Sequence, residues 1–230
     1  MDAIDWHSSI AESFDKGYQT SPRFVERLVV WDAAIGRYLP EGGAVLDAGC
    51  GSGVLSVVAS RRARSVVAFD GSEEMIRIAR AKAPSQNGCD IAFEVATLSE
   101  IERFGRRSFD VVLSSSVLEY VEDLDGALRA HAAMLKKGGI LLVSMPNGDS
   151  LYRRLETGIF HITSRPRYRR CVRHVPHPAI FENTLRRVGL DPVFKTTFAA
   201  APFLGQIMRG AGLQSLSDAM FLVAARELNS

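Results

Sequence analysis

The sequence predicts an α/β fold: a mostly parallel, doubly wound sheet with helices on both faces. Short apolar runs typical of buried strands alternate with segments in which apolar residues recur every three or four positions, as on amphipathic helices. This alternation favours parallel strands joined by helices. A glycine-rich turn directly after the first run marks a strand–helix junction at which such folds bind ligands. The apolar runs are residues 45–46, 65–70, 91–95, 109–113, 140–143, 194–198 and 219–225.

The composition bounds the organisation of the chain. With 230 residues, 47% of them hydrophobic, and a formal net charge of +2, we expect a single domain over residues 1–230 and no nucleic-acid partner. Three cysteines without paired spacing, Cys50, Cys89 and Cys171, favour neither disulfides nor a metal site. The N-terminus lacks the basic and apolar regions of a signal peptide, and no apolar run approaches the roughly 20 residues that span a bilayer. We therefore expect a cytoplasmic protein with no transmembrane segment.

Residues 1–40 precede the first strand and are expected to be helical. Phe24, Leu28 and Trp31 begin a series of apolar positions at steps of three and four, which predicts an amphipathic helix over residues 22–38. Pro22 suits the first turn of that helix because its missing amide hydrogen would be unsatisfied there in any case.

The turn after the first strand reads Val-Leu-Asp-Ala-Gly-Cys-Gly-Ser-Gly over residues 45–53. Glycine allows backbone angles that other residues avoid and lets a ligand approach the main chain. A dinucleotide-binding turn, G-x-G-x-x-G, would need a glycine where the chain has Val54. The pattern D-x-G-x-G-x-G instead resembles the first motif of the class I S-adenosylmethionine-dependent methyltransferases.

The resemblance implies a Rossmann-like, seven-stranded sheet with a C-terminal antiparallel strand, and S-adenosylmethionine as the cofactor. In that family the turn lies beneath the amino-acid part of the cofactor, and an aromatic-rich N-terminal segment often closes over it. Residues 1–40 are therefore a candidate helical lid with Tyr18 as a lid residue, unless their aromatic side chains only attach this segment to the core. The turn residues expected at the cofactor are Asp47, Gly49, Cys50, Gly51 and Gly53.

Asp70 ends the second apolar run, 17 residues beyond the last glycine of the turn. A carboxylate can accept hydrogen bonds from two adjacent hydroxyls, and the resemblance implies that Asp70 does so for the ribose, with Gly71 turning the chain beside it. Met75 stands where the family often rests an apolar side chain near the adenine, although a core methionine would look the same. Where the family often has an adenine-binding aspartate, this chain has Thr97, followed by Leu98, so the threonine hydroxyl or backbone groups would have to supply that contact.

The fourth strand is expected to end at Ser114 and Ser115, across from the glycine turn, because ligands in open α/β sheets bind beyond the carboxyl ends of the strands. We expect both serines near the cofactor or the transferring methyl group. Residues 118–121 resemble a family segment that commonly has histidine in place of Tyr120, so a packing role is expected for this tyrosine. The helix that follows should end at the lysines and glycines of residues 136–139.

Residues 148–178 depart from the alternation of strands and helices, and a connection of this length is usually functional or disordered. Their arginines predict a cap over the substrate pocket that binds an anionic group. The alternatives are a solvated basic face, docking to an acidic carrier protein, and docking to an anionic membrane surface. The expected substrate-binding residues are Tyr152, Arg167, Arg169 and Arg170, and the candidate general bases are His174 and His177.

The resemblance covers about residues 44–147, and its last part looks much like the ubiquinone-type O-methyltransferases. It implies an enzyme that transfers a methyl group from S-adenosylmethionine to a small molecule, at oxygen, by in-line displacement. The alternatives are N- or C-methylation and a cofactor-binding module that acts through protein contacts without catalysis. The expected partner is a small-molecule substrate, either anionic or bound to a carrier.

Overall fold

The computed structural model describes residues 2–83, 88–163, 166–200 and 208–228, except the side chains of His161 and Arg167. In this part of the chain, seven strands form one sheet in the order β3-β2-β1-β4-β5-β7-β6. The first five strands pair in parallel, and β7 runs antiparallel to both β5 and β6. The predicted fold class is confirmed. The strands are β1 (Ala44–Ala48), β2 (Ser65–Asp70), β3 (Asp90–Val95), β4 (Phe109–Ser115), β5 (Leu135–Pro146), β6 (Leu190–Ala200) and β7 (Asp218–Glu227).

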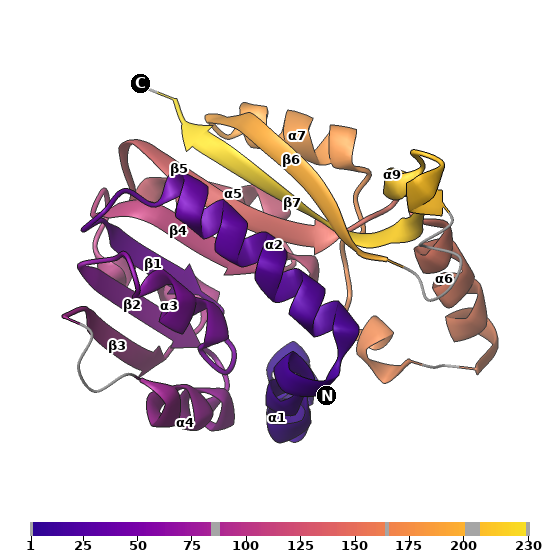
Figure 1. Cartoon of the computed structure of the whole chain (residues 1–230), viewed down its shortest axis with the longest axis horizontal. Coiled ribbons are helices and arrows are strands. Elements are labelled where there is room, and N and C mark those ends of the chain that lie inside the picture. Colours follow the sequence, from indigo (N-terminus) through magenta and orange to yellow (C-terminus); the bar gives the residue numbers. More distant parts are fainter. Residues whose placement is uncertain (1, 84–87, 164–165, 201–207, 229–230) are drawn as a thin grey trace.

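Helices cover both faces of the sheet (Figure 1). The second helix has the bounds that its apolar pattern predicts, and α1 precedes it at a sharp turn at Ser21. The α-helices are α1 (Ala3–Thr20), α2 (Pro22–Tyr38), α3 (Val54–Ala59), α4 (Glu73–Lys82), α5 (Leu124–Met134), α6 (Leu151–Thr163), α7 (Pro178–Arg187) and α9 (Gln214–Ser217). The described residues also form three short 3-10 helices, η1 (Leu98–Phe104), η2 (Leu118–Tyr120) and η3 (Arg167–Arg170).

Two apolar clusters, one on each face, hold the helices to the sheet. Successive side chains of a strand point to opposite faces, so Val45 packs in the cluster of Trp31 on α2, whereas Leu46 packs in the cluster of Leu128 on α5. All four side chains are fully buried. Burial on both faces is the condition under which parallel strands are stable, and it leaves the carboxyl ends of the strands free to build a site.

The helix before β5 ends earlier than predicted. α5 stops at Met134, and residues 136–139 lie inside β5, where the pairing with β4 shifts after Phe109–Leu135. Gly138 has a φ of +74° and therefore turns this irregular stretch of the strand instead of capping the helix. Pairing of the backbone with β4 has overridden the local helix-ending signal.

The C-terminal region also differs from the predicted runs. β6 begins at Leu190, four residues before the predicted strand, and includes Pro192. Proline is tolerated there because β6 is at the edge of the sheet and its pairing shifts between Pro192 and Phe194. Residues 148–178 contain α6 and η3, so much of the predicted cap is helical. Within the described ranges, no helix combines the length and apolarity that crossing a bilayer requires.

Candidate active site

The glycine turn between β1 and α3 has the left-handed backbone that its sequence requires. Gly49, Gly51 and Gly53 have φ values of +75°, +54° and +76°. The turn is tied to the neighbouring strand because the N–H groups of Gly49 and Cys50 donate to the carbonyl of Phe69 at 2.8 and 2.9 Å. A side chain at Gly49 would lie 2.4 Å from Val117, so close packing and backbone conformation both demand glycine there.

Asp47 lies in β1 just before the turn and bonds to α3, the helix that follows the turn. Its side chain is 1% exposed, and its Oδ2 accepts a hydrogen bond of 2.6 Å from the hydroxyl of Ser56 on α3. Burial raises the pKa of Asp47 to about 7, although the bond to Ser56 acts in the opposite direction. Asp47 therefore links the strand to the helix behind the turn.

Asp70 is oriented by two backbone donors at the carboxyl end of β2. Its Oδ2 accepts from the N–H of Gly51 and its Oδ1 from the N–H of Ser72, both at 2.9 Å. Burial raises the pKa of Asp70, and these two bonds oppose that shift. Each carboxylate oxygen keeps a further lone pair that can accept a hydrogen bond from a ligand.

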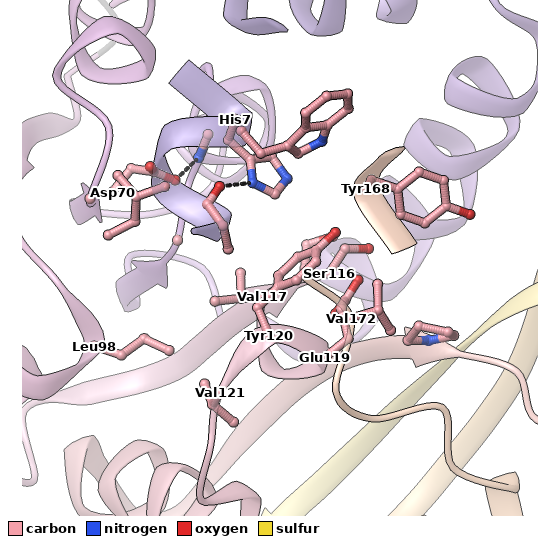
Figure 2. A pocket seen from close by; sticks show the side chains of 18 of the residues that line it. His7, Asp70, Leu98, Ser116, Val117, Glu119, Tyr120, Val121, Tyr168 and Val172 are labelled. Atoms are coloured by element: carbon pink, nitrogen blue, oxygen red, sulfur yellow. Dashed lines mark hydrogen bonds between the residues drawn. The ribbon is translucent and has the colours of Figure 1, made fainter. Parts of the chain in front are cut away.

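The turn and Asp70 open onto one large cavity of about 1590 Å³. Figure 2 shows Asp70 and Tyr168 at opposite sides of it, with the segment that follows β4 between them. The cavity lies beyond the carboxyl ends of β1, β2 and β4, where a doubly wound sheet binds its ligand. The sequence-predicted residues that line it are Gly49, Gly51, Asp70, Gly71, Met75, Thr97, Leu98, Ser115, Tyr152 and Arg169.

A second hollow of about 30 Å³ lies on the other side of the turn and is lined by Asp47, Cys50 and Tyr18. Gly53, Ser114, Arg170, His174 and His177 line neither hollow. Arg167 belongs to η3, and its side chain lies outside the described structure.

The two candidate bases are engaged elsewhere. Nε2 of His174 is 2.9 Å from the carbonyl of Val121, and Nδ1 of His177 is 2.5 Å from the carboxylate of Asp149. His177 is exposed. The structure thus does not bring either imidazole to the cavity in which a substrate would lie.

Other sequence-predicted residues also have local roles. The hydroxyl of Thr97 is within hydrogen-bond distance of Ser99 and Glu100 at the start of η1, because threonine is a favourable cap for a helix. Gly53 allows α3 to approach α4, since an added Cβ would lie 2.8 Å from Ala79. Ser114 is fully buried in β4, and only its neighbour Ser115 reaches the cavity.

Comparison with known proteins covers the middle of the chain, which contains the glycine turn, Asp70 and Glu119. Residues 46–143 match a family described as methyltransferase domain. These residues form a methyltransferase domain. The ubiquinone biosynthesis O-methyltransferase of Caulobacter vibrioides is 42% identical over 107 residues, which are 46% of this chain and 42% of that protein. The chain therefore covers less than half of the curated relative that it matches.

Solved structures share the fold over most of the chain. An S-adenosylmethionine-dependent methyltransferase from Mesorhizobium loti is 25% identical, with a TM-score of 0.61 over 85% of this chain and 96% of that one. The magnesium protoporphyrin IX methyltransferase from Synechocystis, solved with bound S-adenosylhomocysteine, is 17% identical with a TM-score of 0.71 over 97% of each chain. One of these two methyltransferases is named as S-adenosylmethionine-dependent, and the other was solved with S-adenosylhomocysteine.

The N-terminal helices lie outside the matched residues, yet α1 covers the cofactor side of the methyltransferase domain. Ile4 packs on Gly71, where an added Cβ would lie 2.7 Å away, and Phe14 faces Gly51. The hydroxyl of Ser8 donates to Ser72 at 2.8 Å. A lid role for residues 1–40 stays a prediction.

Arg27 of α2 is a site residue that sequence reasoning missed. Its Nη2 donates to the carbonyl and hydroxyl oxygens of Ser115 at 3.0 and 2.6 Å. Its buried Nε has no partner among the described residues. Ser116, next in the chain, has a φ of +58° and a buried hydroxyl that is also unpaired within the described structure. Such strain in a residue other than glycine is typical of functional sites.

Glu119 lies on η2, directly after β4, and lines the cavity with its side chain 3% exposed. Its Oε2 finds no hydrogen-bond partner in the part of the chain that the structure describes. Burial raises the pKa of Glu119 to about 7, whereas Arg27 and Arg153 act to lower it. Both arginines donate to other groups and leave Oε2 without a partner in the described structure. The neighbouring Tyr120 packs edge to face against His7.

Arg153 of α6 is the centre of a hydrogen-bond network that includes Tyr168, which lies across the cavity from Asp70 (Figure 2). Its Nη1 is 2.7 Å from Glu156 and 2.6 Å from the hydroxyl of Tyr168, and its Nε donates to the carbonyl of Ala219 at 3.1 Å. The hydroxyl of Tyr168 donates in turn to Glu156 at 2.6 Å. This network joins α6, η3 and β7 and holds α6 and η3 on the sheet. The sequence carried no signal that would separate Arg153 from the other arginines of the segment.

Proposed function

We propose that the protein transfers the methyl group of S-adenosylmethionine to an oxygen atom of a small-molecule acceptor. The observation that carries this proposal is the carboxylate of Asp70, held by two backbone N–H groups beside a left-handed glycine turn and facing a large cavity. A fixed carboxylate with free lone pairs is suited to the two hydroxyls of a ribose.

The residues present fit this cofactor. Three residues that line the cavity each have a buried polar atom without a partner among the described residues: Nε of Arg27, Oγ of Ser116 and Oε2 of Glu119. Unpaired buried groups are costly unless a ligand satisfies them. Gly49 and Gly51 would approach the amino-acid part of the cofactor, and Arg27 would pair with its carboxylate. Met75 and Leu98 would contact the adenine.

Bound S-adenosylmethionine supplies a methyl group that is electrophilic because it is attached to a sulfonium. The work of the protein is to orient the acceptor oxygen in line with that group and to take its proton. We assign the second task to Glu119, because its carboxylate is buried, its Oε2 has no partner in the described structure, and its pKa is raised to about 7. A base with such a pKa is matched to proton abstraction near pH 7.

The acceptor is proposed to carry an anionic group. Arg169 donates through Nη2 to Thr157 at 2.7 Å, and its buried Nε has no partner among the described residues. Arg23 lies 4.7 Å from the ring centroid of Tyr152 and donates to its hydroxyl at 3.2 Å. These donors suit a carboxylate or phosphate. Transfer to oxygen is supported by the name of the Caulobacter relative.

Calorimetry with S-adenosylmethionine and S-adenosylhomocysteine tests the cofactor site. Replacement of Asp70 by Ala is expected to lower the affinity for both by about 1–3 kcal/mol, because two charge-assisted bonds to the ribose are lost. Asp90→Ala is the matched control, since Asp90 is exposed at the amino end of β3. If the purified protein binds neither compound, the proposal is refuted.

A second measurement tests the acceptor atom. A metabolite extract is incubated with the protein and methyl-labelled cofactor, and the labelled product is examined by mass spectrometry. We expect a methyl ether or ester on an anionic molecule. A label on nitrogen or carbon would refute transfer to oxygen.

A further inference from the structure

The backbone around Glu119 is held by the segment that follows η3. The N–H groups of Arg173 and His174 both donate to the carbonyl of Glu119, at 2.7 and 3.1 Å. Nε2 of His174 donates to the carbonyl of Val121 at 2.9 Å, since a carbonyl oxygen only accepts. We propose that His174 is a positioning residue that keeps the carboxylate of Glu119 at the cavity. This inference rests on the proposed function, in which Glu119 takes the proton of the acceptor.

Glu119 needs support from another segment because its own helix holds it weakly. It belongs to η2, a 3-10 helix of three residues, and the hydrogen bonds of such helices have poor geometry. Its side chain is 3% exposed, yet Oε2 has no partner among the described residues. A buried carboxylate in this condition lowers its free energy by moving to water. The bonds from residues 173 and 174 oppose that movement.

The ring of His174 is the side chain to test in this contact. The guanidinium of Arg173 also lies 3.0 Å from the carboxylate of Glu122, but both of these side chains are exposed, so their ion pair contributes little. The ring of His174 is partly buried and bonds to a backbone oxygen of the segment that carries Glu119. Replacing this ring removes one bond between the two segments and leaves the backbone bonds to Glu119 in place.

The holding segment also reaches the cavity. Figure 2 shows Tyr168 and Val172 around the cavity together with Glu119. Arg169, which is proposed to meet the anionic group of the acceptor, lines the cavity as well. Residues 169–174 therefore join the proposed anion site to the proposed base.

Methyl transfer from labelled S-adenosylmethionine to a metabolite extract tests the proposal in two variants. Leucine at position 174 removes the donor to Val121, whereas the side-chain amide of glutamine retains one. We expect His174→Leu to lower the maximal rate at least about tenfold, because small displacements of a reacting group slow turnover steeply. The apparent KM for S-adenosylmethionine should stay within about twofold of wild type. His174→Gln should retain most of the wild-type rate.

His177→Leu is the matched control, because His177 bonds to Asp149 and does not line the cavity. It should leave the rate unchanged. His174→Phe keeps a ring without the donor and replaces His174→Leu if the leucine variant does not fold. A wild-type rate in His174→Leu, an equal loss in His174→Gln, or an equal loss in the control overturns the proposal. Loss in His174→Gln would mean that the imidazole itself is required, not only its donor.

Denaturant unfolding tests the same contact without turnover. At about pH 8.5, Glu119→Gln should stabilise the otherwise wild-type chain because it removes a buried, uncompensated carboxylate. In the His174→Leu background the carboxylate reaches water, so the same change should stabilise the chain by less than about half as much. Equal stabilisation in both backgrounds overturns the proposal, whatever the transfer assay shows. If Glu119→Gln leaves methyl transfer unchanged, the proposed base is wrong, and the unfolding comparison still decides the role of His174.

Discussion

Glu119 should make the folded protein less stable as the pH rises, and Glu119→Gln should remove that effect. The carboxyl is 3% exposed and its pKa is raised from 4.5 to about 7 by burial. In the unfolded chain the same group is hydrated and titrates near its usual value. Between these two pKa values the folded state binds more protons than the unfolded state, so the free energy of unfolding falls as pH increases.

The magnitude follows from the size of the shift. Each pKa unit corresponds to about 1.4 kcal/mol, so the carboxylate costs the folded state about 3 kcal/mol once the pH exceeds both pKa values. At about pH 5 the folded state has already lost part of this stability, because the carboxyl of the unfolded chain is largely ionised there. The variant should therefore gain about 2 to 3 kcal/mol relative to wild type between about pH 5 and pH 8.5.

The assay is denaturant unfolding of both proteins at the two pH values. A buried glutamine amide has its own cost, but that cost does not depend on pH and cancels in the comparison. Glu122→Gln is the control, because Glu122 lies three residues along the chain and is 83% exposed in its pair with Arg173. Identical pH dependence in wild type and Glu119→Gln would refute the assignment of a buried, perturbed carboxyl. In turnover the same variant should lower kcat by about 10²- to 10⁴-fold while retaining S-adenosylhomocysteine binding.

Two further variants test the packing of the site. Gly53→Ala should destabilise the fold by about 2 kcal/mol or more, because alanine is strained at a φ of +76° and its Cβ would lie 2.8 Å from Ala79; thermal unfolding measures this, and cofactor affinity of the folded fraction should not change. Arg153→Leu should cost about 3–5 kcal/mol in denaturant unfolding, because the 10%-exposed carboxylate of Glu156 is left without its charge partner. A loss below about 1 kcal/mol would mean that the network contributes little.

The tertiary structure changed the view of the site because side chains from distant segments converge on it. His174 and His177 are chemically suitable bases, but hydrogen bonds to Val121 and Asp149 hold them away from the cavity. Residues 118–121 resemble a family segment, but that resemblance did not single out Glu119 as a site residue, and glutamate is usually exposed. Only its burial beyond β4, beside two arginines bonded to other groups, gives it a pKa near 7.

The sequence by itself determined the strand–helix order, the glycine turn and the acid at the end of β2, because these depend on local periodicity and on the backbone angles that glycine allows. It also determined α2, whose apolar residues recur at helical spacing. The tertiary structure alone decided which polar groups face the cavity, since that depends on contacts between segments far apart in the chain. Arg27 meets Ser115 across 88 positions, and Arg153 meets Ala219 across 66. Such contacts leave no periodic trace in the sequence, because each is fixed by the packing of whole helices on the sheet.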